Sequence, residues 1–523
     1  MEQLVIQQET PICNGHTGAS STPAPRVWLV ALPFISHVMS MTNLARQLAS
    51  GGISVSLFVS EDDLRRLKTA RKNLMENWVL QGLDIQPRIL DAGPSSLAAG
   101  AGGSERFVTL FHRFEEAFKE TLKKEAQTDS RPTCVIADFW MPGAREAAIK
   151  HDVPAWTFSP FSAAYLATWV YIRHLESNGM FKLPETFKDK RCEQAFISLP
   201  GFPIMRLHDL GEPLFKDDPL YSYSIRNAST MEQCDVVLLS GFLELEPRQT
   251  QELNRILKAY ALINGRKAPE VYHVGPIFPF PSRKNGLEAV KSGAADEVHP
   301  SITFLDSQPA SSVIFLAFGS DVNHTVQQIQ EIAYGLENSQ QPFICVLHLP
   351  KRESGVRADD IFSVIPEDCL ARTKGRGLFV QSFAPQMEVL SHPSTGAFIS
   401  HCGQNSVLEA LASGVPILAW PCLYDQSMNC RFLVEEAQIA LEICPGLLQG
   451  GGYVDRKQIE ASIHTLFHTK EGSALRRRVS EMKLKAEAAK GPNGSSTKNL
   501  HAVCAKLKDL AKAHLENCSA LIS

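Results

Sequence analysis

Short apolar runs of strand length recur along the chain, and stretches with apolar residues at helical spacing follow most of them. In the first half these runs lie at residues 27–32 (VWLVAL), 53–59, 133–138, 154–158 and 235–240. In the second half they lie at residues 312–320 (SVIFLAFGS), 343–349, 377–380, 396–400 and 415–420. Because strands that alternate with helices are joined by crossovers, the pattern predicts parallel sheets covered by helices, which is an α/β fold.

A stretch rich in proline and charge at residues 275–300 separates the two series of strands. We therefore predict two α/β domains, at residues 27–274 and 301–490, with 275–300 as their linker. Beyond them, residues 491–523 continue an amphipathic helical pattern after the interruption KGPNGSS. This last stretch is predicted to form a helical tail.

Composition and charge narrow the class of protein. With 523 residues, 44% of them apolar and 21% charged, the chain is too long for one core and has the composition of a folded, soluble protein. A net charge of −4 argues against nucleic acid or an anionic membrane as a partner. No run approaches the roughly 20 apolar residues that span a bilayer, and the polar residues 1–26 predict a disordered leader rather than a signal peptide. The twelve cysteines are scattered without CxxC pairs, which favours reduced thiols and a cytoplasmic protein.

Polar residues gather between the predicted strand at 396–400 and the helical pattern that follows it. The tripeptide HCG at 401–403 therefore lies at a strand's carboxyl end and opens a helix, which is where open parallel sheets bind ligands. The free N–H groups of a helix N-terminus suit phosphate, and Gly403 allows the backbone to approach closely. Asn405, Ser406 and the histidine add side-chain donors.

Three further polar residues extend this pattern. Glu409 lies one helical turn after Asn405, where its carboxylate could accept two hydrogen bonds from a ribose diol. Asp425 and Gln426 follow the predicted strand at 415–420 and suit neighbouring sugar hydroxyls. Taken singly, Asn405 is more often a helix cap, Glu409 a solvated or capping residue, and an Asp-Gln pair a loop. Together at this spacing they indicate a sugar-nucleotide site.

The whole segment 383–426 closely resembles the signature segment of plant UDP-sugar-dependent glycosyltransferases that act on secondary metabolites. That signature reads W-A-P-Q, then H-C-G-W-N-S-x-x-E, then G-V-P and finally D-Q. Other segments of this chain also resemble conserved segments of the family. They are PGFPIMRLHDL, FLELEP and VYHVGPI in the first half and FLDSQPASSVIFLAFGS and GSSTKNL in the second. The resemblance implies a GT-B fold, in which two Rossmann-like domains face each other and the last helix packs back on the first domain.

The resemblance also implies a UDP-sugar site built from the signature segment and the end of the strand at 312–320. Its expected members are Ser320, Phe383, Ala384, Gln386, His401, Gly403, Gln404, Asn405, Ser406, Glu409, Asp425 and Gln426. By position, Phe383 would stack on uracil, and Ala384 and Gln386 would hold uracil and ribose. Glu409 would also contact the ribose. Ser320, His401, Asn405 and Ser406 would contact the diphosphate. Asp425 and Gln426 would contact the sugar hydroxyls.

Two residues depart from the family signature. Phe383 replaces the first tryptophan and keeps an aromatic face for the base, although with less stacking area. Gln404 replaces the second tryptophan, which removes an indole near the sugar and supplies an amide. The final glutamine is similar to that of glucose-using members, so glucose is the expected sugar, with galactose or a pentose as alternatives.

A catalytic base is expected from the first domain. His37 comes after the first predicted strand and before the first helix, and a neutral imidazole with a reference pKa of about 6.5 can accept a hydroxyl proton. Asp138 ends another strand, where the resemblance implies the carboxylate that fixes the histidine tautomer. The alternatives are a structural histidine and an Asp138 that caps the next helix. Family members usually have Gly-His at this point, and this chain has Ser36-His37.

These residues predict an inverting transferase that needs no metal and no cofactor besides its co-substrate. It would move a sugar from a UDP-sugar to a hydroxyl of a small lipophilic acceptor such as a plant secondary metabolite, and it would act as a monomer. The threonine that family members often place near the sugar's 6-hydroxyl has no clear equivalent among Ser159, Pro160 and Ser162.

Two other functions remain open from the residues alone, and a third is disfavoured. The same base could deprotonate an acceptor that attacks through an aromatic carbon and forms a C-glycoside. The two missing tryptophans would also fit a sugar-nucleotide-binding protein with little catalysis. A dinucleotide-dependent oxidoreductase would need GxGxxG after the first strand, but LPFISH contains no glycine there. The glycine-rich run AAGAGGSE at residues 98–105 lacks a preceding strand and predicts a flexible loop near the acceptor entrance.

Overall fold

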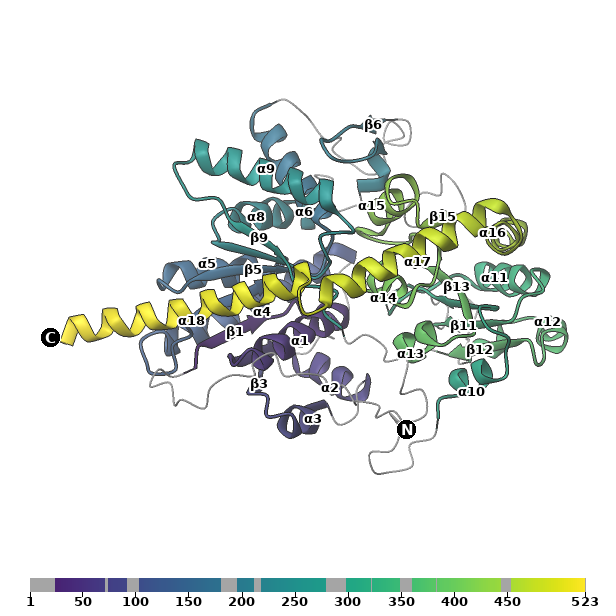
Figure 1. Cartoon of the computed structure of the whole chain (residues 1–523), viewed down its shortest axis with the longest axis horizontal. Helices are drawn as coiled ribbons and strands as arrows, with labels where there is room; N and C mark the ends of the chain where they lie inside the picture. The colour runs from purple at the N-terminus through teal and green to yellow at the C-terminus, as the bar shows by residue number, and fades with distance from the viewer. Residues whose placement is uncertain are drawn as a thin grey trace, which may run out of the picture.

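The computed structural model describes residues 24–70, 74–91, 103–179, 195–210, 218–278, 298–320, 322–348, 360–381, 383–443 and 453–522. Two parallel sheets organise this part of the chain, and each is flanked by helices (Figure 1). Most of the predicted leader and linker, and residues 98–102 of the predicted glycine-rich loop, lie outside the described residues. The first strand already includes Arg26, one residue before the predicted start of the first domain.

The first sheet has seven parallel strands in the order β3-β2-β1-β4-β5-β8-β9. Their bounds in chain order are β1 Arg26–Val30, β2 Ser54–Val59, β3 Ile85–Ile89, β4 Cys134–Asp138, β5 Ala155–Ser159, β8 Val236–Leu239 and β9 Glu270–His273. The helices of this half are α1 Ile35–Ser50, α2 Glu61–Ala70, α3 Leu74–Leu80, α4 Gly103–Glu125, α5 Pro142–Lys150, α6 Ala163–Ser177, α8 Leu220–Met231 and α9 Pro247–Ile263. A short antiparallel hairpin, β6 Phe196–Ile197 with β7 Met205–Arg206, is followed by a 3₁₀ turn at Leu207–Leu210.

The second sheet has six parallel strands in the order β12-β11-β10-β13-β14-β15. Their bounds are β10 Val313–Ala317, β11 Phe343–Leu347, β12 Gly377–Gln381, β13 Thr395–Ser400, β14 Ile417–Ala419 and β15 Ala440–Glu442. Its helices are α10 Pro300–Asp306, α11 Val326–Asn338, α12 Glu367–Arg372, α13 Gln386–Ser391, α14 Gln404–Ser413, α15 Gln426–Arg431 and α16 Arg456–His468, with a 3₁₀ turn at Ile361–Ser363 and a π-helical turn at Phe432–Glu436. The described residues therefore confirm the predicted α/β fold with two parallel sheets.

The central strands are the ones that the apolar pattern predicts best. Every residue of β4, β10 and β13 is buried, because helices cover both faces of each sheet, so these strands read as continuous apolar runs. The pattern misses β3, β9 and β15, each of which is an edge strand of its sheet. β3 even contains Pro87, which an edge strand tolerates because one of its sides needs no ladder hydrogen bonds.

Two long helices connect the sheets. α17 Lys470–Lys490 packs against α14 and α16 in the second half, and α18 Ser495–Ile522 then crosses to the first sheet (Figure 1). Leu500, Val503 and Leu507 of α18 are buried in the same core cluster as α1 and β1. Asn499 Nδ2 also donates to the carbonyl of His273, the last residue of β9, over 2.9 Å. The final helix thus ties the C-terminal end of the chain to the first sheet.

None of the helices within the described ranges combines the length and the hydropathy needed to cross a bilayer.

We expect Leu507→Ala to lower the free energy of unfolding by about 2–5 kcal/mol, because Leu507 is fully buried between α18 and the first sheet. Leu484→Ala on α17 is the matched control, since Leu484 is 64% exposed and its truncation leaves no cavity. Urea denaturation of both variants measures the difference. Equal losses in the two variants would show that α18 does not belong to the first domain's core.

Candidate active site

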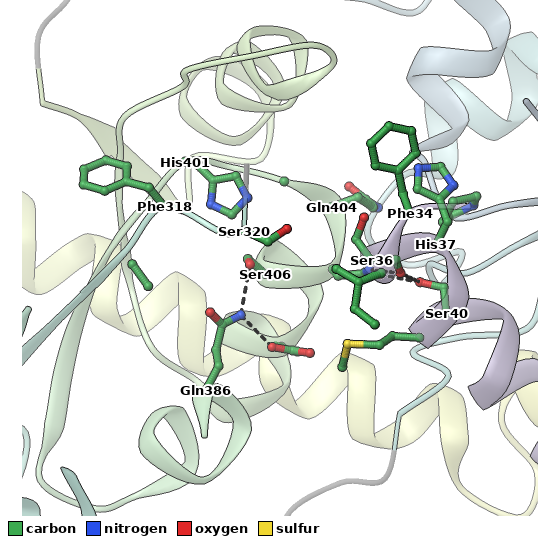
Figure 2. A pocket seen from close by; sticks show the side chains of 18 of the residues that line it. Phe34, Ser36, His37, Ser40, Phe318, Ser320, Gln386, His401, Gln404 and Ser406 are labelled. Atoms are coloured by element: carbon green, nitrogen blue, oxygen red, sulfur yellow. Dashed lines mark hydrogen bonds between the residues drawn. The ribbon is translucent and has the colours of Figure 1, made fainter. Parts of the chain in front are cut away.

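A cavity of about 860 Å³ lies between the carboxyl ends of the two sheets and is lined by both halves of the chain. All twelve residues predicted for the UDP-sugar site line it, and so does His37. Figure 2 shows His401, Ser320, Ser406 and Gln386 on one side, opposite Phe34, His37 and Ser40 on the other. Asp138 is the one predicted residue outside the lining, because it lies behind His37.

His37 and Asp138 form a hydrogen-bonded pair. His37 is in the first turn of α1, and its Nδ1 lies 2.8 Å from Oδ2 of Asp138, the last residue of β4. The other carboxylate oxygen of Asp138 accepts a hydrogen bond from the Trp140 backbone N–H over 3.0 Å. A buried carboxylate with both oxygens bonded holds the imidazole as the Nδ1–H tautomer. Nε2 is then the ring nitrogen that can accept a proton from a ligand in the cavity.

A buried arginine fixes the strand end that carries this carboxylate. Arg145 of α5 is fully buried and donates to the carbonyl oxygens of Asp138 and Phe139 over 2.6 and 2.9 Å. It also donates to Thr230 Oγ1 of α8 over 2.8 Å. Because carbonyls and a hydroxyl satisfy the guanidinium, it orients the end of β4 without taking the Asp138 carboxylate away from His37.

The predicted phosphate side lies where β13 ends and α14 begins. His401 is packed so closely that a Cβ added to Gly403 would lie 2.6 Å from its Nε2, and one added to Gly319 would lie 2.9 Å away. A side chain at either position would therefore displace the His401 ring, and Gly319 also has a φ of 74°, which favours glycine. Burial lowers the pKa of His401 to about 4, so the ring is neutral near pH 7 and carries a single N–H donor.

Gln386, Ser406 and Glu409 form a small hydrogen-bonded group on the same side. Nε2 of Gln386 donates to Ser406 Oγ over 2.9 Å and to Glu409 Oε2 over 2.7 Å. The bonds hold the Glu409 carboxylate beside the cavity, where it can accept hydrogen bonds from a diol. Phe383 is 54% exposed at the same side, which leaves its ring face accessible to a base.

Asp425 and Gln426 follow β14 and start α15. Gln426 Oε1 accepts hydrogen bonds from the backbone N–H groups of Cys422 and Leu423 over 2.9 and 2.7 Å. Its side-chain NH₂ group is therefore the part that can bind a ligand. Asp425 Oδ2 accepts from Asn429 Nδ2 over 2.7 Å. Gln404 lines the cavity and is only 7% exposed. Within the described part of the chain its Nε2 has no hydrogen-bond partner.

Asn405 differs from the expectation that its side chain serves the diphosphate. Its Nδ2 donates to the carbonyl of Ser36 over 3.0 Å, and its Oδ1 accepts from Ser40 Oγ over 2.9 Å. Both polar atoms therefore bond the first two turns of α1, across the cavity from the rest of the predicted phosphate side.

Aromatic side chains form the wall around His37. The ring of Phe161 lies 5.2 Å from the His37 ring, and Phe34 contacts Phe107 and Phe111 of α4 at 5.1 and 5.9 Å. Trp140 and Tyr165 complete this wall. This aromatic wall was not predicted from the sequence, although the four-residue spacing of Phe107 and Phe111 indicates two aromatic rings on one face of a helix. Ser159 and Ser162 instead accept backbone N–H groups at the start of α6, and only Pro160 of the three lines the cavity.

Known proteins share both the sequence and the fold. The family described as "UDP-glucoronosyl and UDP-glucosyl transferase" matches residues 279–443. Phloretin 2'-O-glucosyltransferase of Pyrus communis is 34% identical over 398 residues, which are 75% of this chain and 80% of that protein. UDP-glycosyltransferase 88B1 of Stevia rebaudiana is 33% identical over 90% of this chain and 96% of its own length. This chain belongs to the plant-type UDP-glycosyltransferases.

Solved structures agree with this assignment. Phytolacca americana UGT2 complexed with UDP-2fluoro-glucose and pterostilbene superposes with a TM-score of 0.72 at 26% identity, over 93% of this chain and 100% of that one. TcCGT1 in complex with UDP gives a TM-score of 0.75 at 26% identity with the same coverage. The transferase therefore has the expected GT-B fold, and the oxidoreductase alternative is wrong.

Asp425 is a buried carboxylate in the lining of the transferase's cavity, and few groups around it offset the cost of its burial. Burial raises its pKa to about 6, and the hydrogen bonds from the Asn429 side chain and from its own backbone N–H offset only part of that rise. Arg145, by contrast, has five polar contacts to share its buried charge. Asp425 is thus kept ionised near pH 7 at a cost in stability, which is usual for a residue that serves a ligand.

We expect Asp425→Asn to stabilise the ligand-free transferase at pH 7.5 by about 2–3 kcal/mol and to have no such effect near pH 4. The folded pKa of Asp425, about 6, lies above the unfolded value of 3.8, so wild-type stability falls as the pH rises through this interval. The asparagine variant lacks that fall. Denaturant unfolding between pH 4 and 8 measures it, with the exposed Asp509→Asn as control. A variant less stable than wild type at pH 7.5 would contradict the strained carboxylate.

Proposed function

We propose that this transferase moves glucose from UDP-glucose to a hydroxyl group of a small aromatic acceptor, with inversion at the anomeric carbon. The observation that carries the proposal is the His37–Asp138 pair, which faces the neutral His401 and the N-terminus of α14 across one cavity. A base opposite a leaving-group site is the arrangement that a single displacement requires.

The acceptor hydroxyl would lie beside Nε2 of His37. Nε2 takes the hydroxyl proton as the oxygen attacks the anomeric carbon, the bond from that carbon to the UDP oxygen breaks, and UDP leaves with the electron pair. Asp138 stabilises the imidazolium through the 2.8 Å hydrogen bond to Nδ1. Because attack and departure occur on opposite faces of the sugar, one step inverts its configuration.

The departing UDP would be stabilised by the N-terminal N–H groups of α14, by the His401 N–H and by the hydroxyls of Ser320 and Ser406. Ser406 accepts from Gln386, so its own O–H stays available as a donor. We propose that these groups serve in place of a metal ion. Phe383, Ala384, Gln386 and Glu409 would hold uracil and ribose, and Gly403 would let the α-phosphate approach the backbone.

The chemistry of the acceptor follows from the wall around His37. Phe107, Phe111, Trp140, Phe161 and Tyr165 present aromatic faces to the cavity, which suits a flat phenolic ring. Relatives named for phloretin 2'-O-glucosylation, and a neighbour solved with pterostilbene, support an acceptor of this class.

We also propose that the transferase is a monomer and that it is located in the cytosol. The eight cysteines whose side chains the structure describes are free thiols, seven of them buried, and that is the state a reducing compartment maintains.

We expect His37→Ala to lower kcat of glucosyl transfer about 10²–10⁴-fold while UDP affinity stays within about twofold, because only the proton acceptor is removed. Asp138→Asn should lose activity in the same range by allowing the wrong imidazole tautomer. Product formation from UDP-glucose and a panel of phenols, with calorimetric titration of UDP, measures both. A His37→Ala variant with wild-type turnover would defeat the proposed mechanism.

Gln404 gives a test of the donor sugar. We expect Gln404→Trp to change the ratio of kcat/KM between UDP-glucose and UDP-galactose or UDP-xylose by about tenfold, with little change in UDP affinity. The physical reason is that Gln404 lines the cavity and the substitution replaces its amide with a larger, apolar indole. A donor screen with NMR analysis of the products measures the ratio and shows whether the new bond is to oxygen or to carbon. Equal behaviour on every donor would contradict a role for Gln404 in sugar choice.

A further inference from the structure

The first turn of α1 is bonded directly to the donor half of the transferase. Asn405, the second residue of α14, donates to the Ser36 carbonyl and accepts from Ser40 Oγ, and these two contacts measure 3.0 and 2.9 Å. Ser40 Oγ also lies 3.1 Å from the Ser36 carbonyl, so its one hydroxyl proton is shared between that carbonyl and Asn405 Oδ1, and the three residues form one hydrogen-bonded group. The dashed lines beside Ser36 and Ser40 in Figure 2 mark this group.

The residues of this group that belong to α1, Ser36 and Ser40, lie before and after the proposed base, His37. Ser36 precedes His37 in the chain, and Ser40 lies one helical turn later on the same face, so Asn405 grips α1 on the turn from which the imidazole projects. Ser40 is 2% exposed, so its hydroxyl is held in one place. An amide is suited to this contact because it donates and accepts at once, which neither a carboxylate nor an alkyl side chain does.

We propose that Asn405 is a positioning residue, which acts through α1 to set the distance between His37 and the anomeric carbon. The inference rests on the proposed function, in which His37 is the base. It replaces the direct diphosphate contact that the resemblance implies for the Asn405 side chain, because both polar atoms of that side chain already bond α1. Asp138 orients the imidazole from behind, and Asn405 aligns the whole turn with the half of the molecule that holds the sugar nucleotide.

The proposal has a characteristic signature in a double-mutant cycle. Ser40→Ala and Asn405→Ala remove opposite ends of one contact, so each should lower kcat about tenfold, and the double variant should be no slower than the slower single variant. UDP affinity should stay within about twofold in all three, because the diphosphate site is untouched. Ser50→Ala is the matched control. Ser50 Oγ donates to the Arg46 carbonyl over 2.9 Å, the same bond within α1 but far from Asn405, and its loss should leave kcat unchanged.

Steady-state kinetics with UDP-glucose and calorimetric titration of UDP test the cycle. Losses in kcat that multiply in the double variant would overturn the proposal. So would UDP binding weakened about tenfold in Asn405→Ala but unchanged in Ser40→Ala, which is the result of a direct diphosphate contact. If Ser40→Ala does not fold, Ser40→Cys keeps the volume with a much weaker donor and carries the same expectation.

The outcome separates this inference from the proposed function. Wild-type turnover in His37→Ala would remove the base on which both depend. An inactive His37→Ala together with wild-type kcat in Ser40→Ala and Asn405→Ala would leave the proposed function standing and overturn only the role of Asn405.

Discussion

The chemistry of this transferase depends on one geometric constraint, which is that all strands of a parallel sheet end at the same edge. β1 and β4 deliver His37 and Asp138 to one edge, and β10, β13 and β14 deliver the donor residues to another. Because α18 packs into the core of the first sheet after α17 has packed on the second half, the two edges are held facing each other. The cavity between them therefore places the proposed base opposite the proposed donor site.

The buried charges of the site are handled in two different ways. Asp138 is compensated on every side, by His37, by the Trp140 N–H and by an arginine that secures the strand behind it. Asp425 accepts one hydrogen bond from another side chain, that of Asn429, and burial raises its pKa, which fits the proposed role of its carboxylate in accepting hydrogen bonds from sugar hydroxyls. The first carboxylate orients a neighbour inside the protein, whereas the second is left for a ligand.

Much of this arrangement could be predicted from the residues. Apolar runs located the central strands because both of their faces are buried, and the position of His37, Asp138 and Asp425 at strand ends placed them at one cavity. Edge strands such as β3 and β9 were missed, since partly exposed strands lack a continuous apolar run. The arginine behind Asp138 and the bonds between Asn405 and α1 could not be predicted, because they join segments 7 to 369 residues apart through side-chain directions that no local pattern encodes.

The glycines that enclose His401 have a consequence for the end of the catalytic cycle. Burial keeps the His401 ring neutral near pH 7, so in the proposed reaction the leaving nucleotide would meet dipoles and hydroxyls rather than a full positive charge on this ring. Attraction of this kind is short-ranged and is weakened little by salt. In that reaction no ion pair with His401 would have to be broken for the nucleotide to diffuse away, which favours rapid turnover.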